Sequence, residues 1–353
     1  MTSAVLIVLA VAAVTLAAVA MLRRFAVPAP VVMVVAGLVI SFLPFVPDVS
    51  LDPHLVLLGL LPLLVFDAAV TSSPSALRRD VRSIGILAVL LVVATAVGVA
   101  VVAHELGHLS WPMAFVLGTA VGPTDAAAAT SIARRLGLPR RLTTLLEGEA
   151  LFNDATALVL YAAAVTAATT GRFSVGQTAA TVAYAAIVGA AIGAVVGVAG
   201  RWLGSYVDDP PIEIVGSLLL AYAAYLPAEA LGASGVLAAV TAGLYLGWHS
   251  SGPAFSARIR LQSAAFWETL VFLVNAALFI LVGLSFDIFT RQARESPAHL
   301  ALTAAAVVAT VIVIRLGWMW AFGHGPGWRE RVVLGWSGMR GAITLAALLA
   351  VPH

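Results

Sequence analysis

The sequence contains no cysteine and no lysine, and only 10% of its 353 residues are charged. The missing cysteine excludes disulfide bonds, thiolate metal sites and a cysteine nucleophile. Soluble globular domains carry about 25% charged residues, so the low charge excludes an ordinary soluble fold. The net charge is +2, and all 19 basic residues are arginines scattered over short loops, which excludes a nucleic-acid-binding patch.

Apolar residues are abundant instead: they make up 61% of the chain, and the mean hydropathy is +1.04. A transmembrane helix needs about 20 mostly apolar residues. Twelve stretches qualify: 4–22, 27–46, 54–73, 82–103, 111–133, 142–168, 175–203, 212–227, 233–248, 264–286, 299–322 and 332–351. The sequence therefore predicts an all-α polytopic membrane protein with about twelve transmembrane helices. The first stretch lacks a basic region and a cleavage site, which favours a retained helix over a signal peptide.

Arginine placement predicts the orientation of these helices. The odd-numbered loops hold Arg23, Arg24, Arg78, Arg79, Arg82, Arg134, Arg135, Arg140, Arg141, Arg201, Arg258, Arg260, Arg329 and Arg331. The even-numbered loops hold only Arg172, Arg291 and Arg294. Cytoplasmic loops are enriched in arginine. We therefore expect the odd loops in the cytoplasm and the N-terminus outside the cell membrane.

Two stretches contain helix-breaking residues near the middle of the membrane. Stretch 111–133 contains TAVGPTDAAAATS, and stretch 332–351 contains GWSGMRGAIT. Proline lacks a backbone donor and glycine loosens a helix, so both are candidate discontinuous helices. Paired interruptions in corresponding halves indicate a transporter with inverted repeats. The two stretches lie seven helices apart, which fits two six-helix repeats around a linker helix. That scheme needs thirteen helices, one more than the twelve found.

Ionisable residues at membrane depth are costly and are therefore functional candidates. They are Asp67, Asp125, Glu147, Glu149, Asp154, Glu213, Glu229, Glu268, Arg315 and Arg340. A buried acid with a buried arginine indicates a structural ion pair as readily as a functional site. Asp154 differs, because Asn153 and the break at Thr124 and Asp125 offer a polar group and backbone carbonyls that can replace water around a cation. An apolar surrounding opposes the charged carboxylate, so a proton and a cation could compete for Asp154.

The segment AVGPTDAAAATSIARRLGLPRRLTTLLEGEALFNDATALVLY, residues 120–161, resembles the core of bacterial sodium/proton antiporters of the monovalent cation:proton antiporter family, which includes the NhaP and NHE exchangers. LLPLLVFDAA, FWETLVFLVNAALFILVGL and GWSGMRGAITLAALLA resemble other motifs of that family. The likeness covers nearly the whole chain. It implies a homodimeric transporter, not an enzyme, with no cofactor, which exchanges Na⁺ (alternatively Li⁺ or K⁺) for H⁺ in pH homeostasis and sodium tolerance.

The resemblance also implies the ion site. Asp154 would be the carboxylate that binds Na⁺, with Asn153 as its partner. Thr124 and Asp125 would form the unwound crossover, where backbone carbonyls can face the ion. The Asn-Asp pair has one titrating acid, and family members with this pair are generally electroneutral. We therefore expect one proton to be exchanged for one cation.

Other positions follow from the same resemblance. Glu149 and Arg315 would form a structural salt bridge, and Arg340 would offset carbonyl ends left by the second broken helix. Asp67 and Glu268 would lie near the access path. The family usually has serine at the position of Ala150, and the missing hydroxyl leaves the choice of cation open.

The family divides into a scaffold and a moving core. Here the scaffold, which also dimerises, would comprise residues 1–75 and 212–290. The core would comprise 82–168 and 299–353, with residues 175–203 as the linker helix. Alternating access would come from the core sliding against the scaffold while Asp154 is occupied.

Two other functions compete with exchange. His104, Glu105 and His108 spell H-E-x-x-H, which on a helix can hold zinc in a metalloprotease. The motif falls at the outer end of a span and no third ligand accompanies it, so we expect a solvated loop without zinc; a weak external metal or proton sensor is a further alternative. The nearer rival is a sodium-coupled symporter.

Overall fold

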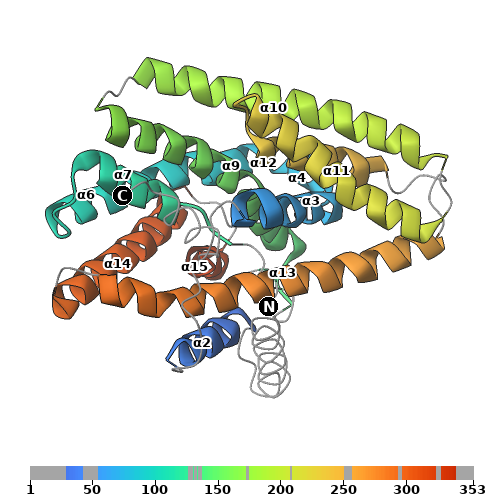
Figure 1. Cartoon of the computed structure of the whole chain (residues 1–353). Coiled ribbons are helices and arrows are strands. Elements are labelled where there is room, and N and C mark those ends of the chain that lie inside the picture. The colour runs from blue at the N-terminus through green and yellow to red at the C-terminus, as the bar shows by residue number, and fades with distance from the viewer. Residues whose placement is uncertain are drawn as a thin grey trace.

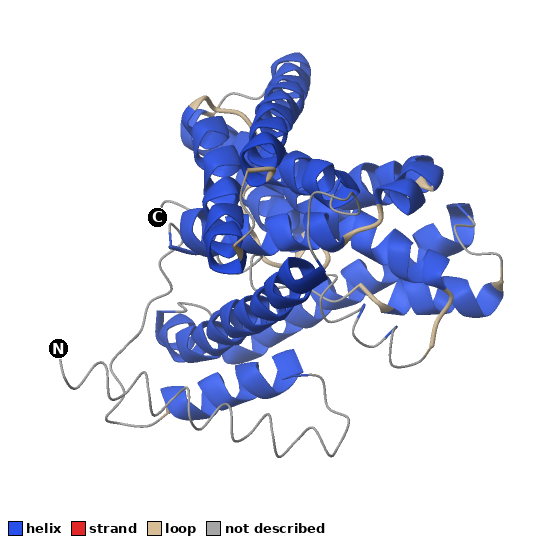
Figure 2. Ribbon diagram, turned by 90° about the vertical axis from the view of Figure 1, so that its right-hand side faces the viewer, coloured by secondary structure: helices blue, strands red, loops and turns tan. Residues whose placement is uncertain are grey.

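The structure, a computed structural model, describes residues 29–42, 55–125, 130, 133, 137–171, 175–206, 209–249, 257–292, 296–322 and 327–338. All the elements in these residues are helical (Figures 1 and 2). They are α2 (Ala29–Ser41), η2 (Leu55–Leu60), α3 (Leu61–Thr71), α4 (Pro74–Arg79), α5 (Val81–Gly85), η3 (Ile86–Leu91), α6 (Val92–Glu105), α7 (Trp111–Val121), α9 (Arg140–Thr170), α10 (Val175–Gly204), α11 (Pro210–Ala230), α12 (Gly235–His249), α13 (Ala257–Gln292), α14 (Pro297–Phe322) and α15 (Trp328–Trp336). The expected helix 4–22 lies outside the described residues.

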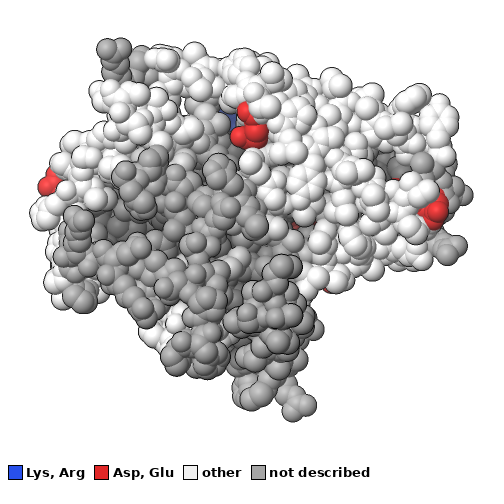
Figure 3. Space-filling view, in the orientation of Figure 1, with Lys and Arg blue, Asp and Glu red and all other residues white. Residues whose placement is uncertain are grey.

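The helices have the length and the surface of a membrane protein. Six described helical segments are long and apolar enough to cross a bilayer: Val81–Glu105, Arg140–Thr170, Gly176–Gly204, Pro210–Ala230, Leu261–Ser285 and Ala298–Phe322. Three shorter apolar helices accompany them: Pro30–Ser41, Val56–Thr71 and Trp111–Val121. The described surface in Figure 3 is almost entirely uncharged. The prediction of a polytopic all-α membrane protein is confirmed.

Small residues allow the helices to approach closely. Where α6 and α7 pack together, a Cβ added at Gly118 would collide with the backbone carbonyl of Ala96. Where α2 and α13 pack together, a Cβ added at Gly283 would lie 2.7 Å from the backbone nitrogen of Leu38. Lipid offers no hydrophobic drive for association between helices, so close backbone packing of this kind stabilises membrane bundles.

Local sequence signals determine where the functional helices begin and end. α9 starts directly after Pro139 and ends at Gly171, which has φ 66° and donates its N–H to the carbonyl of Ala167. Glycine is favoured there because the left-handed conformation carries no Cβ penalty. α7 ends at Val121, and residues 122–125 are not helical. The interruption therefore lies where GPTD predicts it.

For the second expected break, in stretch 332–351, the structure describes only the residues before it. α15 ends at Trp336, immediately before Ser337 and Gly338. The remainder of the expected stretch 332–351 lies outside the described residues. The inverted repeats, and the crossing of the two discontinuous helices, therefore stay predictions.

α9 lies at the centre of the bundle (Figure 1). It contacts α3, α5, α7, α12, α15 and η3. Its buried apolar residues join one hydrophobic cluster with Leu61, Leu87, Val240 and Leu334 from four of these neighbours. The chain therefore holds α9 from several sides, and its polar residues are positioned by a rigid surrounding.

Two π-helical turns were not expected from the sequence. η2 runs directly into α3, and η3 lies between α5 and α6. In η2 the backbone carbonyl of Gly59 accepts a hydrogen bond of 2.5 Å from the hydroxyl of Tyr222 on α11. η3 packs directly on α9, and η2 packs on α3, which also contacts α9.

Candidate functional site

The break after α7 is held against α9 by a buried asparagine. Asn153, with 0% exposure, donates from Nδ2 to the backbone carbonyl of Thr124 at 3.1 Å and to the Thr124 hydroxyl at 2.8 Å. The helix has stopped at Val121, so the carbonyl of Thr124 is outside any helical ladder. A side chain on one helix thus satisfies backbone that the break exposes on another, which is how irregular backbone is tolerated at membrane depth.

A buried ion pair lies next to this break. Arg315 on α14 donates to Glu149 on α9 through Nη1 to Oε1 at 2.5 Å and through Nη2 to Oε2 at 2.9 Å. Both side chains are 2% exposed. Arg315 also donates from Nε to the carbonyl of Leu334 on α15 at 3.0 Å. The guanidinium therefore joins three helices around one carboxylate.

Thr124 connects the ion pair to the asparagine. Its hydroxyl donates to Glu149 Oε1 at 2.9 Å and accepts from Asn153. A continuous hydrogen-bonded path therefore runs from Arg315 to Asn153. The two hydrogen bonds that Asn153 Nδ2 donates to Thr124 hold the side-chain amide of Asn153 against the break.

The two aspartates lie close to this path. Asp154 on α9 and Asp125 in the break interact electrostatically. The Asn153 Oδ1 atom is buried, and no residue that the structure describes gives it a hydrogen-bond donor. A buried acceptor without a donor costs about 1–3 kcal/mol, and either a cation or a donor would remove that cost. The four residues 124, 125, 153 and 154 thus form a compact set of oxygen-bearing groups.

The remaining residues that the sequence analysis assigned to the site lie away from this hydrogen-bonded path or outside the described residues. Ala150 is on α9 and adds only a methyl group, so it brings no oxygen to the set. Asp67 is half-buried on α3, whereas Glu268 is exposed on α13. Arg340 lies outside the described residues. Neither access-path residue belongs to the hydrogen-bonded path from Arg315 to Asn153.

The H-E-x-x-H segment does not form a helical metal site. α6 ends at Glu105, and His108 lies beyond the helix with φ 51°. His104 is bonded to the carbonyl of Leu109 at 2.7 Å and its ring stacks on Trp111. The two histidines therefore do not share one face of a helix, as a zinc metalloprotease site would require. Among the described residues, no group of three or more His, Cys, Asp or Glu side chains could hold a metal ion.

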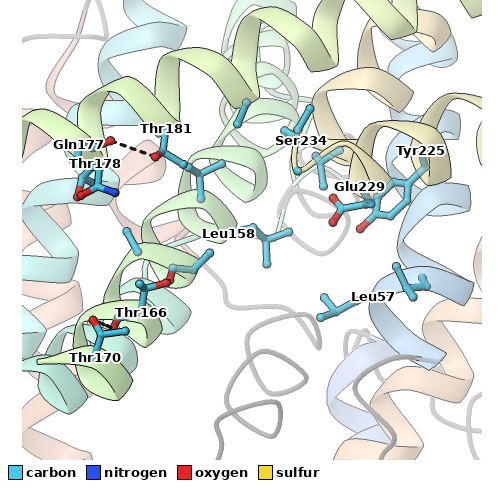
Figure 4. A pocket seen from close by; sticks show the side chains of 18 residues that line it. Leu57, Leu158, Thr166, Thr170, Gln177, Thr178, Thr181, Tyr225, Glu229 and Ser234 are labelled. Carbon is cyan, nitrogen blue, oxygen red and sulfur yellow. Dashed lines mark hydrogen bonds between the residues drawn. The ribbon is translucent and has the colours of Figure 1, made fainter. Parts of the chain in front are cut away.

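A cavity of about 1100 Å³ lies along the second half of α9. Its wall is formed by η2, α9, α10, α11 and the start of α12. On α9 the lining residue nearest to Asp154 is Leu158, four residues further, which is one turn or about 6 Å along the axis. Figure 4 shows Leu158 pointing into the cavity from α9, with Glu229 and Tyr225 on another wall.

Sequence reasoning missed most of this cavity. Glu229 stood out only as an ionisable residue; in the structure its Oε1 accepts a hydrogen bond of 2.9 Å from the backbone N–H of Gly235. Leu57, Leu158 and Tyr225 carry no signal in the sequence, because apolar residues are everywhere in a membrane protein. The ion pair between Asp80 and Arg141, at 3.0 Å, was also not anticipated.

Comparison with known proteins finds a matching family model and several similar sequences. The family model described as "Sodium/hydrogen exchanger, transmembrane" matches residues 9–353. An uncharacterized Na(+)/H(+) exchanger of Mycobacterium bovis is 38% identical over 94% of this chain and 64% of its own length. The Na(+)/H(+) antiporter ApNhaP of Aphanothece halophytica is 32% identical over 92% of this chain and 63% of its own.

The fold has solved counterparts. The sodium proton antiporter MjNhaP1 of Methanocaldococcus jannaschii, determined at pH 8, superposes with a TM-score of 0.77 at 18% identity, covering 99% of this chain and 88% of the other. At that identity the likeness concerns the fold. The chain spans 64% of the length of the mycobacterial relative and 63% of the length of ApNhaP.

Proposed function

The chain belongs to the sodium/hydrogen exchanger family, and from this premise we propose that it exchanges a monovalent cation for protons across the membrane. Na⁺ is the first candidate cation, with Li⁺ and K⁺ as alternatives. Asp154 is the shared site, flanked by Asn153, Thr124 and Asp125. The cation and the proton are transported substrates, and the proposed chemistry needs no cofactor and no zinc.

The orphaned oxygen of Asn153 is the observation that carries this proposal. Asn153 donates from Nδ2 to Thr124, which leaves its Oδ1 buried and without a donor among the described residues, one position before Asp154 in the chain. Oxygen atoms are the ligands that alkali and other hard cations prefer. A dehydrated cation at Asp154 would satisfy that oxygen, and a proton would neutralise the carboxylate instead. The two ions therefore compete, and the apparent KM for sodium should rise as the pH falls.

The proposal assigns the movement to two parts of the chain. Residues 82–168 and 299–353 form a moving core, residues 1–75 and 212–290 form a scaffold through which two copies dimerise, and residues 175–203 link them. The buried pair of Glu149 and Arg315 ties α9 to α14 within the core, which supports their movement as one body.

We also propose an electroneutral exchange with the N-terminus outside the cell. Of the two carboxylates at the site, Asp154 and Asp125, the proposal has Asp154 alone exchange its proton, so one proton is traded for one monovalent cation without moving net charge. Proteoliposomes at an imposed membrane potential test this: the exchange rate should not change with the potential. A rate that follows the potential would contradict one-for-one exchange.

The decisive test compares two single substitutions in everted membrane vesicles, with proton flux followed after addition of Na⁺, Li⁺ or K⁺. Asp154→Asn removes the titrating group and should abolish cation-dependent proton flux. Glu105→Gln changes an exposed acid of the H-E-x-x-H segment and should leave the flux unchanged. Cation-dependent flux that persists in Asp154→Asn would remove Asp154 from the site. Flux lost in Glu105→Gln would revive the zinc alternative.

A sodium-coupled symporter is the second candidate, because the cavity of about 1100 Å³ along the second half of α9 is large enough for a small organic molecule. Symport requires sodium and the organic solute to move in the same direction. Sodium-driven proton efflux in vesicles that contain no organic solute would exclude it.

A further inference from the structure

Two histidines that are far apart in the chain lie next to each other at one end of the bundle. His108 is in the connection from α6 to α7, and His299 is in the first turn of α14. α6 packs on both α7 and α14 (Figure 1). The imidazole rings of His108 and His299 have their centres 5.8 Å apart and their planes 8° apart. The H-E-x-x-H segment therefore meets a histidine that the motif does not contain.

The backbone of the connection fixes the position of His108. Its φ of 51° is a left-handed conformation that residues other than glycine rarely adopt. The turn is held by His104, whose Nδ1 donates to the carbonyl of Leu109 at 2.7 Å, and by the Leu109 N–H, which donates to the carbonyl of Ala103 at 3.2 Å. Conformations of this kind persist only where the surrounding structure determines them, and they concentrate at functional sites.

The connection also packs closely on α14 next to the two histidines. A Cβ added at Gly107 would lie 3.3 Å from the Thr303 methyl group. Thr303 follows His299 by four residues, so the two side chains share one face of α14. The Thr303 hydroxyl is buried and has no hydrogen-bond partner among the described residues. The face of α14 that meets the connection thus carries an imidazole and an oxygen that lacks a partner.

The spacing of the two rings suits a shared metal ion. A nitrogen ligand lies about 2 Å from zinc, so two imidazoles on one ion have their ring centres about 5–6.5 Å apart. The separation of 5.8 Å between His108 and His299 falls within this range. Each imidazole has two nitrogens, so one can bind a metal while the other keeps a hydrogen bond. Imidazole is a ligand that Zn²⁺, Ni²⁺ and Cu²⁺ favour.

We propose that His108 and His299 are the two protein ligands of a site for a divalent transition metal of the Zn²⁺ class. Water completes the coordination, and the Thr303 hydroxyl hydrogen-bonds to that water. Two protein ligands hold a metal weakly, so the chain purified without added metal carries none and exchange does not require it. The bound ion ties the α6–α7 connection to α14. The proposal is independent of the proposed exchange function.

Zinc binding to the purified protein tests the site. The protein, without a polyhistidine tag, is dialysed in detergent against increasing Zn²⁺, and bound zinc is measured by elemental analysis. The native chain should bind zinc saturably. His108→Ala and His299→Ala should each weaken binding about tenfold or more, because each removes one of two ligands. His249→Ala is the matched control: it removes an imidazole that contacts Tyr245 on α12, and binding should not change.

Thermal unfolding gives a second measurement on the same variants. A metal that binds only the folded chain stabilises it, so zinc at about 100 times its Kd should raise the melting temperature by about 3–5 °C. The rise should occur in the native chain and in His249→Ala, and should be lost in His108→Ala and His299→Ala. Melting temperatures measured without zinc show whether a substitution has damaged the fold.

The absence of cysteine allows the geometry to be tested with a different metal. Thiolates are soft ligands that prefer soft metals. His108→Cys combined with His299→Cys should bind Cd²⁺ at least about tenfold more tightly than either single substitution, because only the pair can hold the ion from both sides. The proposal is overturned if zinc binding by the native chain is not saturable, if the alanine variants bind zinc as the native chain does, or if the paired cysteines hold Cd²⁺ no better than one cysteine.

Metal binding is measured without transport, so its outcome is separate from that of the exchange assay. A chain that binds zinc as expected but moves no cation would contradict the proposed function and leave the histidine site in place. Normal cation-dependent proton flux without saturable zinc binding would overturn the histidine site and leave the proposed function in place.

Discussion

Replacing Arg315 with methionine should destabilise the protein strongly, because the Glu149 carboxyl group would lose its ionic partner in a place with 2% exposure. In the intact protein that carboxylate accepts two hydrogen bonds from Arg315, at 2.5 Å and 2.9 Å, and one from Thr124 at 2.9 Å. Removing one member of a buried ion pair costs about 3–5 kcal/mol. Folded proteins are stable by only about 5–15 kcal/mol, so the loss is a large part of the total.

The chain offers a matched control in a second ion pair. Arg141 donates to Asp80, with an Nη2 to Oδ1 distance of 3.0 Å, but the Arg141 side chain is 54% exposed. Water screens such a pair, and its contribution is about 0–1 kcal/mol. Arg141→Met should therefore lower the free energy of unfolding by no more than that. The two substitutions remove the same chemical group, and burial is the difference between them.

The assay is denaturant-induced unfolding of the purified protein in detergent micelles, with the free energy of unfolding compared between variants. A third variant, Glu149→Met combined with Arg315→Met, removes both charges and should be less destabilised than Arg315→Met alone, because no charge is stranded. Equal losses for Arg315→Met and Arg141→Met would refute the reasoning. So would a double variant whose loss equals the sum of the two single losses.

Three further outcomes test other parts of the structure. Thr124→Val removes the hydroxyl that joins Glu149 to Asn153 and should destabilise the protein by about 1–3 kcal/mol and slow exchange, whereas Thr124→Ser should retain both properties in the same unfolding and flux assays. Gly118→Val should lower the yield of folded protein and the melting temperature in detergent, because its side chain would collide with the backbone of Ala96; a melting temperature equal to that of the native chain would contradict this packing. Chelators should leave exchange unchanged, and elemental analysis should find no stoichiometric zinc; inhibition reversed by added zinc would contradict both expectations.

Much of the fold could be predicted because the signals are local. Apolar length predicts a spanning helix wherever about 20 such residues follow one another, and the structure has helices at the described stretches. Gly171 ends α9 and the GPTD run ends α7 because glycine and proline act on the backbone within their own turn. The residues of the candidate site could also be picked out from the sequence. Asn153 and Asp154 are neighbours in the chain, and the GPTD run predicts the helix break that contains Thr124 and Asp125.

The rest depended on contacts between distant segments. Glu149 and Arg315 are 166 residues apart, and only the resemblance to a family suggested that they meet. No sequence pattern predicts the π turns at 55–60 and 86–91, because a π turn contains the same apolar residues as an α-helix. The histidines of the H-E-x-x-H segment were readable as a motif, yet whether they share a helical face depends on where α6 ends.

The sequence by itself determined that this chain crosses a membrane many times, roughly where its helices lie, and which carboxylate is the candidate for ion exchange. Hydropathy and backbone-breaking residues act over one or two turns, so they can be read directly from neighbouring letters. Only the tertiary structure decided that Glu149 meets Arg315 from 166 residues away, and that the second half of α9 lines a cavity with η2, α10, α11 and α12. Both features join helices that are far apart in the chain, so they depend on how those helices pack and not on neighbouring residues.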